Sequence, residues 1–521
     1  MKKTFILFSL FFVFCCAWGQ VVYSDYSDPD VCEGTEGDYW LTASSFQCTP
    51  GLPILHSEDL VHWELVNYAV ERLLPVEHYN AVRHGCGVWA PSIRRHGGVY
   101  YIYWGDPDYG VWMVKTTDPR GRWSEPVLVM EGRGVIDTCP LWDEDGRCYL
   151  VNGWANSRCG FNSVLTVREL SADGTRVIGK PVLVFDGQVE GNHTIEGPKF
   201  YKKDGYYYIL APAGGVEKGW QVALRSKSVY GPYESKVVFN QDGIHQGGMV
   251  QTLSPSLPHN GEGDRAGWGF ICFQEKGAYG RILHLLDVNW KDGWPMMSVD
   301  KDDKPHGALA ISDATLAYQW HANYQDAFGF LTNDGVRVYG HHVSAQFKNM
   351  WEVPNLYLQK FDGGSWDNAP KNYTQGETFT DTLRMTITAK ADGQASGFIV
   401  MGRDYCRLSV ELEGEQFVLK RITCKNADTG GEETEQVLTQ VKARKYGAGA
   451  KTNYDCHISF GIRCEKGAVC HLSYSLDGKH FTELPEPFQA REGKWIGAKY
   501  GVFSIAPQGG SKGWVDLKLN K

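Results

Sequence analysis

The chain has 521 residues, a formal net charge of −9 and 13% aromatic residues, with 18 Trp and 27 Tyr. This length exceeds what one ordinary hydrophobic core holds, so two domains are expected. The modest negative charge and the lack of a basic stripe exclude nucleic acid as an expected partner and mainly indicate solubility.

The N-terminal segment, MKKTFILFSLFFVFCCAWGQ, has the pattern of an export signal. Two lysines precede an apolar run, and small residues follow at the cleavage positions, so we expect residues 1–19 to be removed and the mature chain to start near Gln20. An uncleaved membrane anchor and a lipoprotein attached through Cys15 or Cys16 are the alternatives. No later stretch is apolar enough to span a bilayer. We therefore expect a periplasmic or secreted protein.

Cysteines continue through the mature chain, which keeps twelve of the 14. Their spacing is irregular and no paired CxxC motifs occur, which argues against a zinc site. Export permits disulfides, but the spacing assigns no pairing.

A repeated pattern follows, in which a turn glycine precedes a strand rich in aromatic residues. Examples are GGVYYIYWG and GYYYILAPAGG. Alternating or continuous apolar residues after a glycine predict strands. The pattern starts at Gly37, Gly97, Gly146, Gly205 and Gly267. Repeats of roughly 50 to 60 residues with several strands each predict a β-propeller. We expect an all-β protein whose residues 20–312 form a five-bladed propeller.

Three acidic residues occupy one position relative to these repeats. Asp28, Asp137 and Glu196 each stand nine residues before the turn glycine of their unit. The innermost strands of a propeller line its axis, so residues at one repeat position are expected to converge in one axial pocket. Like charges crowded into one cavity repel, which favours a functional role for the cluster.

Three converging carboxylates suit the hydrolysis of a glycosidic bond. One acid protonates the leaving oxygen, and a second carboxylate acts on the opposite face of the sugar. The proton donor needs a raised pKa, which a neighbouring carboxylate supplies. The third carboxylate therefore has a task in tuning and orienting the acid.

The segments that carry these acids resemble glycoside hydrolase family 43. The similar stretches include YSDPDV, GVIDTCPLWDEDGRCYL and IEGPKFYKKDGYYYIL, and GVWAPSIRRHGGVYYIYW and GAYGRILHLLDVNWKDGWPMM extend the match over most of residues 23–300. The resemblance implies a five-bladed propeller and an inverting mechanism. It implies Asp28 as general base, Asp137 as the residue that modulates the pKa of the acid, and Glu196 as general acid.

The same resemblance implies residues that bind the substrate. Phe46 would form part of the wall near the scissile bond, Trp89 would stack on the sugar, and Arg281 would contact sugar hydroxyls. His245 is the fourth, because family members often place a histidine near the propeller axis, where it reaches a structural calcium through water. Calcium prefers oxygen ligands, so no direct protein ligand to a metal is predicted. Core packing or a surface ion pair is the plainer explanation of each residue.

From about residue 315 the turn-and-strand repeat stops. Stretches such as LRMTITAKADGQASGFIVMGRDYCRLSVELEGEQFVLKRITC alternate apolar and polar residues, which predicts an antiparallel β-sandwich over residues 313–521. LAYQWHANYQDAFGFLTNDGVRVYGHH resembles the opening of the lectin-like (concanavalin A-like) sandwich in the xylosidase and arabinofuranosidase branch of the family. This domain could wall one side of the pocket, bind polysaccharide, or simply bury a propeller face.

The expected function is that of an exported, inverting exo-glycosidase. It would release terminal α-L-arabinofuranose or β-D-xylose from plant cell-wall hemicellulose, without an organic cofactor. The alternative is a non-catalytic sugar-binding propeller. A third candidate is a retaining fructosidase, whose sequences resemble an Asn-Asp-Pro, Arg-Asp-Pro and Glu-Cys signature. This chain departs from that signature at the corresponding segments, Ser27–Pro29, Ile136–Thr138 and Glu196–Pro198. The choice between arabinose and xylose stays open.

Overall fold

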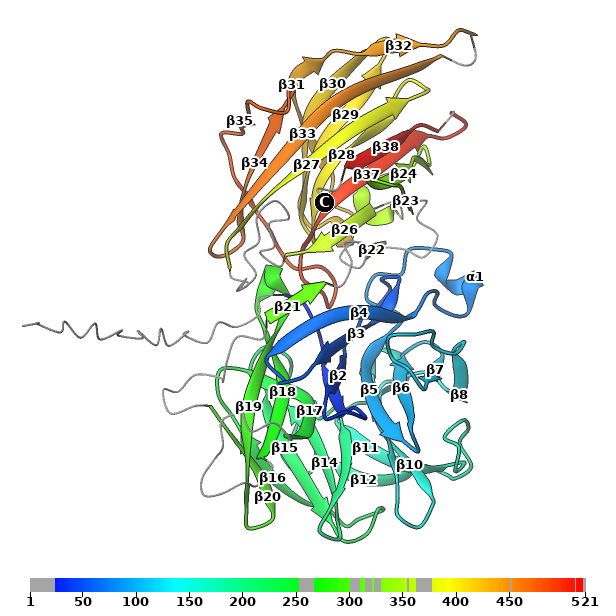
Figure 1. The fold of residues 1–521 in the computed structure, drawn as a ribbon, viewed down its shortest axis with the longest axis vertical. Coiled ribbons are helices and arrows are strands. Elements are labelled where there is room, and N and C mark those ends of the chain that lie inside the picture. The colour runs from blue at the N-terminus through cyan, green and yellow to red at the C-terminus, as the bar shows by residue number, and fades with distance from the viewer. Residues whose placement is uncertain are drawn as a thin grey trace, which may run out of the picture.

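The computed structural model describes residues 24–252, 267–299, 310–313, 321–322, 329–353, 356–361, 377–449, 452–510 and 512–518. The regular secondary structure of the described residues is almost entirely β-strand, as the sequence predicts. Figure 1 shows a group of small sheets, coloured blue to green, below a two-sheet body coloured yellow to red. The expected signal segment, residues 1–19, lies outside the described residues.

The N-terminal part contains five successive antiparallel sheets among the described residues. The first sheet comprises β1 (Asp30–Glu33), β2 (Tyr39–Thr42), β3 (Gly51–Ser57), β4 (His62–Val70) and, parallel to β4, β21 (Ala310–Asp313). The second comprises β5 (Trp89–His96), β6 (Val99–Asp106), β7 (Gly110–Thr116) and β8 (Val127–Glu131). The third comprises β9 (Val135–Trp142), β10 (Cys148–Trp154), β11 (Val164–Leu170) and β12 (Val182–Asp186).

The fourth and fifth sheets repeat this plan. The fourth comprises β13 (Lys199–Lys203), β14 (Tyr206–Ala213), β15 (Trp220–Ser226) and β16 (Glu234–Phe239), and the fifth comprises β17 (Ile244–Thr252), β18 (Gly267–Glu275), β19 (Arg281–Lys291) and β20 (Trp294–Ser298). Short helical turns join some strands, namely α1 (Val76–Tyr79), α2 (Asn156–Cys159) and η1 (Gly277–Tyr279). Among the described residues, no helix is long and apolar enough to cross a membrane.

The predicted turn glycines explain the tight connections between first and second strands. Gly37, Gly97, Gly146 and Gly205 all have positive φ angles, between 58° and 82°. A residue without Cβ adopts this region at no steric cost, so each glycine lets the chain reverse. Gly267 differs, because it opens β18.

The first strands of the sheets lie close together. β1 contacts β5 and β17, β5 contacts β9, β9 contacts β13, and β17 contacts β14 and β15. Apolar side chains fill the space between neighbouring sheets; Val151 and Leu165 of the third sheet, for example, share a buried cluster with Ile209 and Val222 of the fourth. The starts of the five first strands are thereby held next to one another.

The C-terminal part is a sandwich of two large sheets. One has the order β22 (His321–Ala322), β26 (Leu356–Lys360), β37 (Lys499–Pro507), β28 (Ala395–Met401), β29 (Tyr405–Glu413), β30 (Gln416–Cys424) and β31 (Glu433–Val441), with β25 (His341–Val343) beside β37. The other has the order β23 (Gly329–Leu331), β24 (Gly335–Tyr339), β38 (Trp514–Lys518), β27 (Phe379–Ala389), β33 (Asn453–Glu465), β34 (Val469–Ser475) and β35 (Thr482–Glu483), with β32 (Arg444–Tyr446) and β36 (Phe488–Gln489) at its margins. Two short turns, η3 (Met350–Glu352) and η4 (Ala427–Thr429), complete it.

Polar contacts between buried groups join the two parts. The Asp25 carboxylate accepts hydrogen bonds from the backbone N–H groups of Gly497 and Arg281, at 2.8 and 3.0 Å. The Tyr279 hydroxyl accepts a hydrogen bond from the N–H of Ala468 at 2.9 Å. Because Asp25 and Arg281 flank the converging strand ends, these contacts place a loop of the sandwich, residues 491–498, beside them.

Candidate active site

A residue with a left-handed backbone conformation lies where the first strand of each of the five sheets begins or bulges. Asp28, Ala90, Asp137, Gly197 and Gln246 have φ angles of 53°, 33°, 57°, 59° and 52°. The ladders of β5, β9 and β17 shift register at these points. A non-glycine residue in this region costs roughly 1–3 kcal/mol, and such strain concentrates at functional sites. The bulges re-aim these residues toward one another.

A cavity of about 170 Å³ lies where these residues meet. Six of the seven residues predicted from the sequence line it, namely Asp28, Phe46, Trp89, Asp137, Glu196 and Arg281. The three predicted acids therefore share one cavity.

Asp28 is held as a buried carboxylate with two fixed partners. Arg281 donates from Nη1 to Asp28 Oδ1 at 2.7 Å, and Ser44 donates from Oγ to Asp28 Oδ2 at 2.5 Å. Ser44 Oγ in turn accepts a hydrogen bond from the N–H of Ala90 at 2.7 Å. Two hydrogen bonds of this kind fix the orientation of the Asp28 carboxylate.

Asp137 is only 4% exposed and accepts a hydrogen bond from the N–H of Gly197 at 2.8 Å. Burial raises the pKa of Asp137, and the charge on Asp28 raises it further, whereas the hydrogen bond from Gly197 opposes the rise. The bond also ties Asp137 to the residue that follows Glu196. Asp137 is thus placed where its charge raises the pKa of Glu196.

Glu196 opens onto the cavity and carries a raised pKa. Burial is the largest cause, followed by the negative charges of Asp137 and Asp28, and Arg281 opposes the rise. A Cβ atom on Gly153 would lie 3.6 Å from Asp137 Oδ2 and from Glu196 Cα, so the two acids flank this glycine. A carboxylic acid that keeps its proton near neutral pH is the group that general acid catalysis requires.

The equal nine-residue spacing of the acids does not place them at equivalent positions. Asp28 and Asp137 are the left-handed residues of their strands, but in the fourth sheet that position is Gly197, one residue after Glu196. The hairpins after β1 and β9 leave five residues between paired strands, whereas the one after β13 leaves two. The sequence predicted that the three acids converge. It also predicted that they occupy the same position in each repeat, and this is incorrect for Glu196.

Aromatic side chains form the remaining walls. Phe46 is 3% exposed and pairs through its backbone with Val88, and Trp89 donates from Nε1 to Gly85 O at 2.9 Å. Trp495, from the sandwich loop, lies with its ring 6.1 Å from that of Trp89 and is 44% exposed. The sandwich therefore contributes directly to the cavity.

His245 is the predicted residue that does not line the cavity. It is 1% exposed, its Nε2 lies 3.1 Å from Val216 O, and Gln246 reaches the cavity in its place. Burial lowers the pKa of His245 to about 4, so the ring is neutral near neutral pH and donates from Nε2. The buried Nδ1 has no partner among the described residues and is left as an acceptor suited to a water molecule.

The predicted calcium therefore depends on water-mediated contacts. Among the described residues, no group of three or more His, Cys, Asp or Glu side chains is placed to hold a metal ion. The orphaned Nδ1 of His245 fits a water of the ion's hydration shell, because calcium takes oxygen ligands. The ion stays a prediction.

Several cavity residues were not predicted from the sequence. Gln246 occupies the left-handed position beside the predicted His245, and Trp154 and Asn156 lie at the end of β10 and the start of α2. Trp495 lies in the Gly-rich stretch GKWIG of the second domain. An aromatic residue in such a loop was the one available signal, but it does not show which surface the loop covers.

A buried, ion-paired carboxylate and a carboxyl group of raised pKa in one small aromatic cavity suit the hydrolysis of a glycosidic bond. The family comparison agrees. Residues 20–295 match the model of glycosyl hydrolases family 43, and residues 312–519 match that of the beta-xylosidase C-terminal concanavalin A-like domain. The chain belongs to glycosyl hydrolase family 43.

Individual relatives cover either the whole chain or its first part. A beta-xylosidase of Formosa agariphila is 27% identical over 93% of this chain and 86% of its own length. A non-reducing end alpha-L-arabinofuranosidase of Bacteroides ovatus is 30% identical over 52% of each chain. The crystal structure of a mutant of the GH43 protein BlXynB from Bacillus licheniformis superposes with a TM-score of 0.71 at 19% identity, covering 96% of this chain and 97% of that one.

Proposed function

We propose that the protein is an exported, inverting exo-glycosidase that releases a terminal α-L-arabinofuranose or β-D-xylose from hemicellulose. The observation that carries the proposal is the shared cavity, in which Asp28 is ion-paired and Glu196 has a raised pKa. The sheet contacts support closure of the five sheets into a five-bladed propeller whose axis passes through this cavity. The family models and the relatives named above support the substrate class.

In this mechanism Asp28 is the general base. Its carboxylate removes a proton from a water molecule, and the oxygen of that water attacks the anomeric carbon. Arg281 and Ser44 hold the Asp28 carboxylate in position before the reaction begins. Inversion requires about 6.5–9.5 Å between the base and acid carboxyl groups, which leaves room for that water.

Glu196 is the general acid. It donates its proton to the glycosidic oxygen as the bond to the anomeric carbon breaks, and the sugar departs with inverted configuration. The charge of Asp137 disfavours ionisation of Glu196 and so keeps the proton available. The proton then returns through solvent, because Asp28 has gained one and Glu196 has lost one.

The size of the cavity favours action on chain ends. Its volume of about 170 Å³ is smaller than a site for a drug-sized ligand. Trp89 and Trp495 bound it with aromatic surface, which stacks well on sugar rings. We infer that one terminal pentose enters and that the rest of the chain stays outside.

The test is turnover of chromogenic pentosides and of arabinoxylan, arabinan, xyloglucan and xylo-oligosaccharides by the full chain. We expect release of a single pentose and no longer product. Glu196→Ala should cost several orders of magnitude on poor leaving groups and much less on good ones. Binding of these sugars without turnover would favour the alternative, a non-catalytic carbohydrate-binding protein. Cell fractionation with N-terminal sequencing tests export and cleavage near Gln20.

A further inference from the structure

One face of the sandwich carries a row of side chains that the proposed reaction does not use. Phe330 lies directly opposite Arg337, Arg337 opposite Asp516, Asp516 opposite Thr386, and Thr386 opposite His457. Directly opposed residues of a sheet point to the same face. The residues between them in each strand are buried in the core, so this row belongs to the outer surface.

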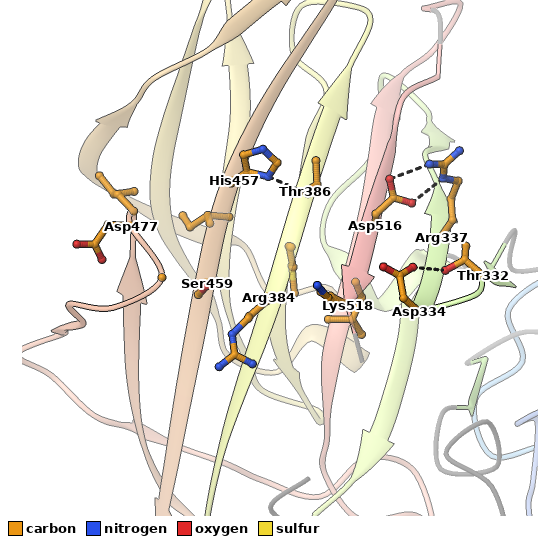
Figure 2. A pocket seen from close by; sticks show the side chains of 15 residues that line it. Thr332, Asp334, Arg337, Arg384, Thr386, His457, Ser459, Asp477, Asp516 and Lys518 are labelled. Atoms are coloured by element: carbon orange, nitrogen blue, oxygen red, sulfur yellow. Dashed lines mark hydrogen bonds and ion pairs between the residues drawn. The ribbon is translucent and has the colours of Figure 1, made fainter. Parts of the chain in front are cut away.

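A groove of about 640 Å³ lies over this row. Figure 2 shows the side chains of Arg337, Asp516, Arg384, Lys518 and His457 standing over neighbouring strands of one sheet. The strands are β24, β38, β27 and β33, with the turn after β34 at the far margin. The groove is thus built on a rigid sheet.

The acidic residues of the groove already have partners within the protein. Asp516 accepts hydrogen bonds from Nε and Nη2 of Arg337 at 2.6 and 2.8 Å. Asp477 accepts from the backbone N–H groups of residues 479 and 480, each at 2.8 Å, and Asp334 accepts from Thr332 at 3.3 Å. These pairings are visible for Asp516 and Asp334 in Figure 2.

The basic residues of the groove include two neighbours of like charge. Arg384 lies directly opposite Lys518, and both line the groove. Like charges placed directly opposite each other in a sheet are destabilising. The Lys518 ammonium has no ion pair or hydrogen bond to any residue that the structure describes. An anion placed beside these two side chains would pair with the Lys518 ammonium.

Aromatic rings continue from the polar row. Trp514 lies opposite Tyr339, with ring centroids 6.0 Å apart, and Tyr339 is 6.1 Å from Phe330, which is 56% exposed. The Arg337 guanidinium lies 4.8 Å from the Trp514 ring centroid. Flat aromatic surface next to hydroxyl, imidazole and charged groups is suited to sugar rings.

We propose that this groove binds a uronic-acid-bearing hemicellulose chain, of the kind in which glucuronic acid branches from xylan. The carboxylate would lie between Arg384 and Lys518, and neighbouring sugars would lie along Thr386, Trp514 and Tyr339. The choice of a xylan backbone depends on the proposed function, whereas recognition of the carboxylate depends on the groove alone. The groove would hold the enzyme on its polymer while the cavity removes terminal residues.

The test is calorimetric binding to the full chain carrying Glu196→Gln, so that the ligand is not consumed. The ligands are xylotetraose with one glucuronic acid, unsubstituted xylotetraose and tetragalacturonate. Charge-assisted hydrogen bonds contribute enough that R384A/K518A should weaken binding of the acidic xylan ligand by about tenfold or more. Binding of xylotetraose should be unchanged. The matched control, K425A/K466A, removes two exposed positive charges of the same domain outside the groove and should leave all affinities unchanged.

Equal affinity of the parent and R384A/K518A for the acidic xylan ligand would overturn the proposal. Tighter binding of tetragalacturonate than of that ligand would overturn the xylan assignment. Turnover of a chromogenic pentoside by R384A/K518A with Glu196 intact is measured separately and should match that of the wild type. A wild-type protein without turnover but with groove binding would refute the proposed function and support the groove.

A second inference concerns two buried cysteines. Cys464 and Cys470 lie directly opposite each other on β33 and β34, 1% and 0% exposed. Opposed residues of an antiparallel pair have Cα atoms ~4.5–5.5 Å apart, within the range that a disulfide spans. The Tyr279 hydroxyl, which binds the same turn through Ala468, lies 4.0 Å from Cys464 Sγ.

We infer that Cys464 and Cys470 form a disulfide when the chain folds in an oxidising compartment. The two thiols lose two protons and two electrons, an S–S bond forms, and an incoming small-molecule or protein disulfide is reduced to two thiols. The bond would fix the turn on which Tyr279 docks, two residues before Arg281. This inference does not depend on the groove.

Peptide mapping of exported protein, alkylated without reduction, tests this inference. We expect a peptide linking Cys464 to Cys470 in the wild type and in the control Cys456→Ala, whose cysteine on β33 lies opposite Ile387. Cys464→Ala should lose the link and leave Cys470 alkylated. Recovery of wild-type Cys464 and Cys470 as separate alkylated thiols, or linked to Cys406, would overturn it.

Discussion

Arg281 and Asp28 form an ion pair of 2.7 Å in which each side chain is only 6% exposed. The pair joins the first residue of β19 to the residue two positions before β1, so it connects the fifth sheet to the first. The same arginine lies beside Asp25, which also binds the sandwich loop through Gly497. One buried contact therefore supports the proposed base, the junction between sheets and the docking of the second domain.

Arg281→Ala should therefore reduce both stability and activity. Removing one partner of a buried ion pair leaves the other charge uncompensated and costs about 3–5 kcal/mol. Thermal unfolding and kcat/KM on a chromogenic pentoside measure the two effects. Arg120→Ala is the control, because its pair with Glu64 is exposed and is expected to contribute at most ~1 kcal/mol. Equal effects of the two substitutions would contradict the role given to Arg281.

Asp137→Asn should move the alkaline limb of the pH profile to lower pH. As the proposed general acid, Glu196 must be protonated to act, so kcat/KM should fall as pH rises through the pKa of Glu196. Burial and the charges of Asp137 and Asp28 raise that pKa, and the substitution removes one of these charges. The expected displacement is on the order of one pH unit. An unmoved alkaline limb would show that Asp137 does not tune the acid.

Glu196→Gln should stabilise the fold at alkaline pH. The folded-state pKa of Glu196 lies above its unfolded value, so its contribution to stability is complete below the unfolded pKa and is lost as pH rises through the folded pKa. Gln cannot ionise and avoids this loss. The melting temperature of the variant relative to wild type should rise between about pH 4 and pH 9. A difference that is constant over this range would rule out the raised pKa.

Trp495→Ala should weaken substrate binding and leaves the proposed catalytic acids in place. The ring lines the cavity beside Trp89, and the substitution exposes the site to solvent. Loss of an aromatic stacking contact should raise KM by about tenfold, with a smaller change in kcat. Trp351→Ala, a sandwich tryptophan that stacks on His84 instead, is the control. Unchanged KM in Trp495→Ala would show that the sandwich only buries a face of the first domain.

The sequence predicted the all-β fold and the meeting of Asp28, Asp137 and Glu196, because turn glycines and aromatic strands recur at regular spacing. It did not predict the one-residue offset of Glu196. That offset depends on the length of the hairpin after β13 and on which residue is left-handed, and spacing alone does not encode either.

Contacts between domains were less predictable. Trp495 is almost 300 residues from Glu196 in the chain, and its place in the cavity depends on how Asp25 binds the backbone of Gly497. His245 shows the opposite case, since the predicted residue is nearby but faces Val216, and its neighbour Gln246 lines the cavity. A single bulge decided which of the two reaches the site.

The configuration of the first sugar released tests the central claim most directly. Proton NMR of an activated pentoside during early turnover distinguishes the two anomers before mutarotation mixes them. An inverted first product is expected if Asp28 activates water while Glu196 protonates the leaving oxygen. A retained first product would contradict this account, because it would make Asp28 a nucleophile that bonds to the sugar.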